Sequence, residues 1–173
     1  SATNALVLRC SGEGEVLYEQ ARVGLGGRIF MCLKFRSMRT NKAASSEWTV
    51  EEKKDNPVTR VGAFLRRTSL DEFPQFLNVL RGDISLIGPR NDVEGLGKRL
   101  GEAVPYYNMR YIVPPGITGW AQINGWRGET DTREKIEQRV KHDLDYIDHW
   151  SLMFDVKILV QTPFALLKSE NAY

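Results

Sequence analysis

Two adjacent carboxylates, Asp71 and Glu72, are the residues of this sequence that most clearly offer chemistry. They precede an apolar pattern of helical spacing, which predicts that they lie at the N-terminus of a helix. The positive end of a helix dipole keeps a carboxylate ionised, and an ionised carboxylate can attack phosphorus to give an aspartyl phosphate. Neighbouring carboxylates can also hold Mg²⁺, which takes oxygen ligands and often bridges to phosphates. The plainer interpretation is that the pair only complements the helix dipole, and the spacing leaves both interpretations open.

Basic residues stand on both sides of this acidic pair. Arg66 and Arg67 are within about one helical turn of Asp71, close enough to reach a phosphate held beside it. Arg90 follows a Gly-Pro pair, whose fixed backbone suits a planar guanidinium directed at an oxyanion. Lys34 lies near the end of an expected strand. Each cation by itself would be a solvated surface charge, but carboxylates and converging cations together indicate phosphoryl or phosphosugar transfer.

A segment with several glycines, residues 117–128, adds two tryptophans and an arginine. It is expected to be strand and loop. Trp120, Trp126 and Arg127 could stack on a nucleobase or a sugar ring, which makes Arg127 a candidate ligand of a nucleotide sugar. Packing in the core is an equally good interpretation of Trp120.

The elements expected around these residues form an α+β domain dominated by helices, with short strands. A hairpin is expected over residues 16–35, where two β-leaning runs flank a glycine-rich turn. Helical spacing recurs in two pieces over residues 59–80 and again over residues 132–147. Residues 84–87 form a short apolar strand, and residues 40–57 a mobile polar connection.

Two residues compete as the cap of the second helical piece. Ser69 and Glu72 have the spacing of a capping box, which starts the helix directly after the serine. With Asp71 as the cap, Pro74 falls in the first turn, where its missing N–H leaves no hydrogen bond unmade. Either choice puts the acidic pair at the helix N-terminus, and Gly82 ends the helix.

Length and composition limit the class of protein. With 173 residues, of which 42% are hydrophobic and 27% charged, the chain suits one globular domain. The formal charge of +2, from 24 basic and 22 acidic residues, argues against a nucleic-acid-binding protein. Two cysteines without paired spacing predict neither a disulfide framework nor a zinc site, and two histidines exclude a multi-histidine metal site.

Residues 152–167 are the most apolar stretch of the chain. Asp155, Lys157, Gln161 and Pro163 interrupt this stretch, which is therefore not the continuous apolar run that a membrane-spanning helix requires. It predicts either a buried helix or one whose apolar side lies on a membrane surface.

Four blocks of the sequence carry a family resemblance: KFRSMR (34–39), LRRTSLDEFPQ (65–75), NVLRGDISLIGPR (78–90) and PGITGWAQING (115–125). They resemble the bacterial sugar transferase family, the monotopic phosphoglycosyl transferases of exopolysaccharide, capsule and O-antigen synthesis. The blocks WRGETDT (126–132) and NAY (171–173) look like the undecaprenyl-phosphate glucose phosphotransferase branch.

The resemblance implies an activity and roles for particular residues. Members of the family transfer a sugar 1-phosphate from a UDP-sugar to a polyprenyl phosphate at the cytoplasmic face of the bacterial inner membrane, and UMP is released. By resemblance, Asp71 is the nucleophile and forms a phosphosugar–aspartate intermediate. Glu72 helps to hold Mg²⁺ and assists the incoming lipid phosphate, and Lys34, Arg66 and Arg90 match basic positions of the phosphate-binding motifs. The alternative is a nucleotide-sugar-binding or scaffolding domain without catalysis.

The chain departs from the family pattern in three places. Family members begin with a re-entrant membrane helix, so residues 1–15 are expected to be a remnant that follows this anchor, and residues 16–173 the catalytic domain. Asn91 stands where the family usually has proline, and Leu33 stands where an aromatic residue usually precedes the lysine. None of these departures removes a chemical group that the reaction needs.

Overall fold

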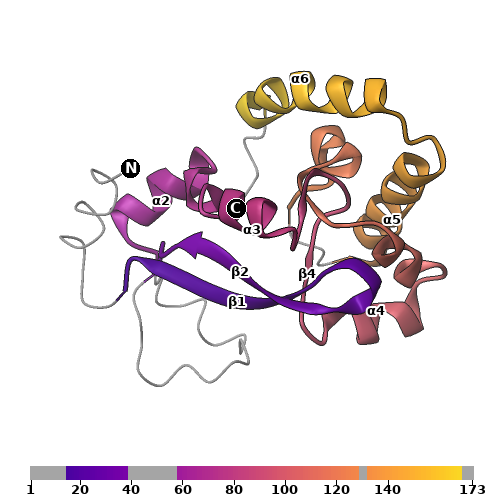
Figure 1. The fold of residues 1–173 in the computed structure, drawn as a ribbon, viewed down its shortest axis with the longest axis horizontal. Coiled ribbons are helices and arrows are strands. Elements are labelled where there is room, and N and C mark those ends of the chain that lie inside the picture. The colour runs from indigo at the N-terminus through magenta and orange to yellow at the C-terminus, as the bar shows by residue number, and fades with distance from the viewer. Residues whose placement is uncertain (1–14, 39–57, 129–131, 169–173) are drawn as a thin grey trace. The chain divides into compact units, whose positions relative to one another are not determined.

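The computed structural model describes residues 15–38, 58–128 and 132–168 (Figure 1). Residues 1–14 and 39–57 lie outside the described residues, and they contain the predicted anchor remnant (residues 1–15), except for Glu15, and the whole predicted mobile connection (residues 40–57). The α+β class with a predominance of helix is confirmed. The domain consists of two compact units. Unit 1 is Ser1–Tyr18 with Lys34–Pro74, and unit 2 is Glu19–Leu33 with Gln75–Tyr173.

The predicted hairpin is formed by β1 (Leu17–Val23) and β2 (Ile29–Phe35), which the short 3₁₀ helix η1 (Leu25–Gly27) joins (Figure 1). Gly26 and Gly27 adopt φ angles of 63° and 79°, a left-handed conformation that glycine reaches without steric cost. A two-residue strand, β4 (Asp92–Val93), pairs antiparallel with the end of β1, so the sheet has the order β2-β1-β4.

Unit 1 places α2 (Arg60–Arg67) directly against the chain that leaves β2. The hydroxyl of Thr59 caps the helix by accepting a hydrogen bond from the Gly62 amide at 2.9 Å. Glycine is required at position 62, because an added Cβ would lie 1.9 Å from the carbonyl oxygen of Ser37. The same carbonyl accepts a hydrogen bond from the Thr59 amide at 3.1 Å. The helix that carries Arg66 and Arg67 is therefore fixed to the end of the strand that carries Lys34.

The two caps predicted for the second helical piece are both wrong. Residues Leu70–Glu72 form a separate 3₁₀ helix, η3, and α3 (Gln75–Arg81) begins only after Pro74. Ser69 has a φ of 56°, and its side chain makes no capping hydrogen bond. The left-handed residue turns the chain sharply after α2, and one 3₁₀ turn follows it. Asp71 and Glu72 therefore lie in a short turn before the helix rather than in the first turn of the helix.

In unit 2 two short strands pair in parallel. They are β3 (Ser85–Ile87), which confirms the predicted strand, and β5 (Gly116–Thr118). Ser85 pairs with Gly116 and Ile87 with Thr118. Gly88 ends β3 where the backbones approach closely, because a Cβ there would lie 2.5 Å from the Pro114 carbonyl oxygen.

After β5 the predicted strand and loop are replaced by helical structure. Residues Gln122–Trp126 form a π-helical turn, η5, in which Gly125 has a φ of 90°. The Asn124 side chain donates to the Trp120 carbonyl at 2.8 Å, and the Ile123 amide donates to the Gly119 carbonyl at 3.1 Å. These two hydrogen bonds close the helical turn. They cannot be predicted from the alternation of residue types, which is why the segment was expected to be strand and loop.

The helices of unit 2 surround two apolar clusters. In the first, Ile136 and Val140 of α5 (Arg133–Asp148) pack on Val104 and Tyr107, beside α4 (Leu96–Ala103) and η4 (Tyr107–Ile112). The helix predicted over residues 132–147 begins one residue later, and the Thr132 hydroxyl caps it by accepting from the Lys135 amide. In the second, Ile158 of α6 (Leu152–Lys168) is completely buried against Ile87 and Tyr146.

Both predicted C-terminal helices are present. In Figure 1, α5 (orange) and α6 (yellow) are successive helices that meet at a sharp corner. In the part of the chain that the structure describes, no helix is both long and apolar enough to cross a membrane.

Candidate active site

The acidic pair lies in unit 1 and is buried. Asp71 and Glu72 are only 5% and 3% exposed. Removing adjacent carboxylates from water is costly unless they are ion-paired, hydrogen-bonded or coordinated to a cation. Ser69, two residues before Asp71, is held in a left-handed conformation that non-glycine residues seldom adopt, and such conformations cluster at functional sites. Burial and local backbone geometry both distinguish this pair from solvated carboxylates that only complement a helix dipole.

A lysine from β2 faces the pair within the same unit. The Nζ atom of Lys34 lies 3.4 Å from Oε1 of Glu72, and their side chains are 17% and 4% exposed. Arg66 and Arg67 occupy the last turn of α2, where the first is half-buried and the second exposed. Of the four cations predicted around the carboxylates, the structure therefore brings Lys34 into direct contact and places two arginines on the helix just before η3.

The chemistry of the buried carboxylate pair is compatible with the predicted magnesium ion. Both side chains offer hard oxygen ligands, and Mg²⁺ usually takes one or two protein carboxylates together with water and phosphate oxygens. Among the described residues, no group of three or more His, Cys, Asp and Glu could hold a metal. A magnesium ion on Asp71 and Glu72, as the resemblance predicts, would need its remaining ligands from water or substrate.

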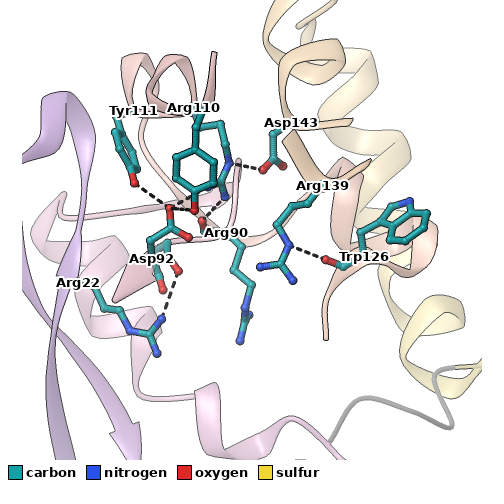
Figure 2. A network of polar contacts seen from close by, with 10 residues as sticks. Arg22, Arg90, Asp92, Arg110, Tyr111, Trp126, Arg139 and Asp143 are labelled. Carbon is teal, nitrogen blue, oxygen red and sulfur yellow. Dashed lines mark hydrogen bonds and ion pairs between the residues drawn. The ribbon is translucent and has the colours of Figure 1, made fainter. Parts of the chain in front are cut away.

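Arg90 lies in unit 2, on a segment whose backbone is held from several sides. Its carbonyl oxygen accepts a hydrogen bond from Nη2 of Arg110 at 2.9 Å, and the next carbonyl, of Asn91, accepts one from Arg22 at 3.3 Å (Figure 2). The Arg90 guanidinium itself donates to Oε1 of Gln122 at 3.4 Å. The segment that follows Gly88 and Pro89 therefore presents this side chain from a rigid backbone, as its sequence predicts.

Beneath this segment lies a buried ionic network that the sequence did not reveal. Arg110 is 1% exposed and forms ion pairs with Asp92 at 2.8 Å and with Asp143 at 2.7 Å (Figure 2). The hydroxyls of Tyr107 and Tyr111 both donate to Asp92 at 2.9 Å. Burial and the neighbouring carboxylate raise the pKa of both phenols above the ordinary value. The network fixes η4, β4 and α5 to one another and holds the Arg90 carbonyl.

The residues on either side of Arg127 have carbonyl groups that accept hydrogen bonds from a second buried arginine, Arg139. Arg139 of α5 donates from Nε to the Trp126 carbonyl at 2.9 Å and from Nη2 to the Gly128 carbonyl. Arg139 is 9% exposed. Burial, together with the positive charges of Arg90 and Arg110, lowers the pKa of Arg139 to about 10. Figure 2 shows the side chains of Arg90 and Arg139 extending toward the same space.

The two tryptophans of this segment have different surroundings. Trp120 packs edge-on against Phe154 with ring centroids 5.0 Å apart, and its indole N–H donates to Asp145 at 2.9 Å. This supports the packing interpretation of Trp120. Trp126 lies beside His142, with ring centroids 6.2 Å apart. The Trp126 carbonyl accepts the hydrogen bond from Arg139, and the candidate ligand Arg127 is the next residue in the chain.

The molecule is a small α+β domain with buried carboxylates in unit 1 and arginines held on rigid segments in unit 2, residue types that suit phosphorylated ligands. The sequence profile of the family described as bacterial sugar transferase matches residues 2–169. The chain therefore belongs to the bacterial sugar transferase family, as the sequence blocks predict.

Curated relatives resemble nearly the whole chain. The chain is 47% identical over 169 residues to the UDP-glucose:undecaprenyl-phosphate glucose-1-phosphate transferase of Escherichia coli K12. The aligned region covers 98% of this chain and 36% of that protein. A protein of the same name from Caulobacter vibrioides is 44% identical, with 98% of this chain and 63% of the relative covered. The UDP-N-acetylgalactosamine-undecaprenyl-phosphate N-acetylgalactosaminephosphotransferase of Aeromonas hydrophila is 42% identical over 97% of this chain and 39% of its own length. The chain thus spans between about one third and two thirds of the length of these relatives.

Proposed function

We propose that this chain carries the catalytic machinery of a phosphoglycosyl transferase. The enzyme would transfer a sugar 1-phosphate, with glucose as the expected sugar, from a UDP-sugar to undecaprenyl phosphate, the first step in building an exopolysaccharide, capsule or O-antigen. The observation that carries the proposal is the buried Asp71–Glu72 pair, with Lys34 3.4 Å from Glu72. The names of the relatives support the choice of donor and acceptor.

The proposed reaction has two displacements at one phosphorus atom. A carboxylate oxygen of Asp71 attacks the phosphorus that bears the sugar, and the bond from this phosphorus to UMP breaks, with the electron pair leaving on UMP. An oxygen of the lipid phosphate then attacks the same phosphorus. The bond to Asp71 breaks, the carboxylate is regenerated, and the product is a polyprenyl diphosphate sugar.

The other residues act on charge and position. Lys34 balances the negative charge of Glu72 and holds its carboxylate beside the nucleophile. Glu72 orients the incoming lipid phosphate, and Arg66, Arg67, Arg90 and Arg127 are the candidate ligands of phosphate oxygens. Asp71 and Glu72 would hold Mg²⁺, which when bound would supply positive charge to the phosphate oxygens.

Release of UMP tests the proposed function. The wild-type chain incubated with UDP-glucose and Mg²⁺ is expected to give a hexose-phosphate adduct, seen by intact-mass spectrometry, and to release an equivalent amount of UMP. Asp71→Asn is expected to lower release by at least about 10³-fold and to remove the adduct, because its amide is a poor nucleophile. Glu72→Gln is the matched control, which is expected to slow turnover while the adduct still forms on Asp71.

Two results would argue against this chemistry. Full activity of Asp71→Asn would exclude covalent catalysis at this residue. Binding of UDP-glucose by the wild-type chain without any UMP release would favour the alternative, a nucleotide-sugar-binding or scaffolding domain.

We further propose that the domain works on a membrane surface, at the cytoplasmic face of the bacterial inner membrane, where the lipid acceptor resides. Among the side chains of α6 that the structure describes, Ile158 alone is fully buried, and large apolar side chains are exposed. They range from 47% to 84% exposed and are Leu152, Met153, Val156, Leu159, Val160, Phe164 and Leu167. In unit 1, Phe64, Leu70 and Phe73 are also exposed, by 51%, 37% and 54%. Exposed apolar residues gathered on one helix are typical of membrane-contacting surfaces.

Flotation with vesicles of anionic phosphatidylglycerol tests this surface. The wild-type chain is expected to float with the vesicles at low salt, and Val156→Ser/Val160→Ser to lose most of this binding, because the two valines lie one turn apart on α6. Ile112→Ser removes a side chain that is similarly exposed, by 55%, but lies in η4, and it should float like the wild type. Equal flotation of all three proteins, or of none, would contradict a membrane role for α6.

A further inference from the structure

Arg139 is a buried cation whose hydrogen bonds, within the described part of the chain, go to backbone carbonyls. It lies on the face of α5 that packs into unit 2, and its two bonds reach the carbonyls of Trp126 and Gly128. Those carbonyls stand on either side of Arg127. A guanidinium is planar and presents several N–H groups in a fixed fork, so a single side chain can hold two acceptors at once.

The burial of the Arg139 guanidinium carries an electrostatic cost. Burial removes water from the guanidinium and Arg90 and Arg110 add repulsion, which together outweigh the attraction of Asp143 and Asp92, so the pKa of Arg139 falls to about 10. Ile136 and Val140, its neighbours on the same face, are buried apolar residues in the core cluster. An apolar side chain at this position would leave the two carbonyls without the Arg139 donor.

The bonded segment is also connected to Arg90. Gln122, the first residue of η5, accepts the hydrogen bond from the Arg90 guanidinium at 3.4 Å, and Trp126, the last residue of η5, is held by Arg139. One π-helical turn therefore joins the segment that carries Arg127 to the side chain of Arg90. The bond from Arg139 to Trp126 therefore restrains the positions of both candidate phosphate ligands, Arg90 and Arg127, relative to each other.

We propose that Arg139 is a positioning residue for the diphosphate of the sugar-nucleotide donor. By holding the carbonyls on both sides of residue 127, it sets the direction in which Arg127 leaves the backbone, so that this guanidinium and that of Arg90 meet phosphate oxygens without reordering. The inference rests on the proposed function, since it assumes that Arg127 is a ligand of a phosphorylated donor. Arg139 itself is not required to touch the donor.

A double-mutant cycle tests the coupling between the two residues. Arg139→Gln, Arg127→Met and the double variant are compared with the wild type by the KM for UDP-glucose in UMP release and by the Kd for UDP-glucose with Mg²⁺ in a direct titration. Arg139→Gln is expected to weaken donor binding about tenfold in the wild-type background, and by less than about twofold when Arg127 is already methionine. The KM for the lipid acceptor should not change.

Two further variants separate positioning from charge and from general stability. Arg133→Gln makes the same substitution on the same helix, at a side chain that is 71% exposed and bonded to Glu137, and it should leave KM and Kd unchanged. Arg139→Lys keeps the charge but lacks the planar fork, so it should weaken donor binding nearly as much as Arg139→Gln. Thermal unfolding of each variant reports its stability. If Arg139→Gln is too unstable to assay, Arg139→Lys completes the cycle.

Several results would overturn the inference. Equal effects of the Arg139 variants with and without Arg127 would show a general structural role. Normal donor binding in Arg139→Lys would show that a positive charge at position 139 is sufficient without the planar fork. Normal donor binding in Arg127→Met would show that Arg127 is not a ligand of the donor, so that there is nothing for Arg139 to position. If the wild-type chain binds UDP-glucose but releases no UMP, the proposed function fails, and the Kd values of the cycle still decide the role of Arg139.

Discussion

At the scale of single residues, the site depends on a strained backbone next to buried charge. Ser69 has a φ of 56°, although the serine has a Cβ that makes this conformation unfavourable. It separates α2, with Arg66 and Arg67 in its last turn, from η3, which contains the carboxylate pair. The sharp turn at this residue therefore determines where Asp71 lies relative to the preceding helix.

Substitution of Ser69 should reveal this strain. Ser69→Gly is expected to change the free energy of unfolding by no more than about 1 kcal/mol, because glycine reaches a positive φ freely but gains entropy in the unfolded chain. Ser69→Val is expected to cost about 1–3 kcal/mol, since a β-branched residue is poorly tolerated there. Urea unfolding measures both changes, and UMP release should fall only in the valine variant. Equal stability of the two variants would contradict strain at this position.

At the scale of secondary structure, one asparagine joins α3 to the edge of the hairpin. Asn78 is fully buried, and its Oδ1 accepts from the Leu33 amide at 3.0 Å. Its Nδ2 donates to the Met31 carbonyl at 2.8 Å and to Asp83 at 2.9 Å. Since β2 is an edge strand, the side-chain amide serves its free N–H and C=O groups as a neighbouring strand would.

Removal of this amide should destabilise the protein strongly. Asn78→Ala is expected to lower the free energy of unfolding by about 2–4 kcal/mol, because it leaves buried backbone donors and acceptors without partners. Leu80→Ala changes a side chain on the same helix that is 84% exposed, and should cost less than about 0.5 kcal/mol. Chemical denaturation of both variants provides the test. A cost for Asn78→Ala no larger than for its control would show that water replaces the amide.

At the scale of the whole molecule, neutral tyrosines are built into the interior next to carboxylates. Tyr107 and Tyr111 donate to Asp92, and Tyr146 donates to Asp155 at 2.8 Å. Burial, followed by interaction with the neighbouring carboxylate, raises the pKa of Tyr111 and Tyr146. For Tyr107 burial also dominates, and it outweighs the opposing charge of Arg110. These phenols therefore stay protonated in the folded protein at a pH where the unfolded chain loses its phenolic protons.

This difference predicts alkaline unfolding. Because the folded pKa values are raised, the contribution of these phenols is complete below about pH 10 and is lost as the pH rises above it. The loss is at most about 1.4 kcal/mol per pH unit for each phenol, and solvent screening makes it smaller for the partly buried Tyr111. Urea midpoints between pH 9 and pH 11 should show this loss, and Tyr111→Phe should make it shallower. Tyr106→Phe, which removes a phenol that is 75% exposed, is the matched control. A pH dependence for Tyr111→Phe as steep as that of the wild type would contradict the interpretation.

Local patterns in the sequence were enough to predict much of this molecule. The hairpin, α2, α5, α6 and the strand after Gly82 follow from periodicity and from glycine, which act over a few neighbouring residues. The family follows from ordered blocks of residue types, and the structure brings one of the predicted cations, Lys34, to Glu72. The caps at Ser69 and Asp71 were wrong because a left-handed bend outweighed the local capping preference.

The buried polar residues depended on contacts between distant parts of the chain. Arg110 finds Asp143 across 33 residues and Arg90 across 20, and Asn78 finds Met31 across 47. Arg139 and Asp143 do share the helical spacing of the apolar face of α5, which is the one local sign that they are buried. A charged or amide side chain is stable inside a protein only when its partners are present, and the folded chain alone brings those partners together. For this reason the network under Arg90 and the bonds on either side of Arg127 emerged only once the structure was known.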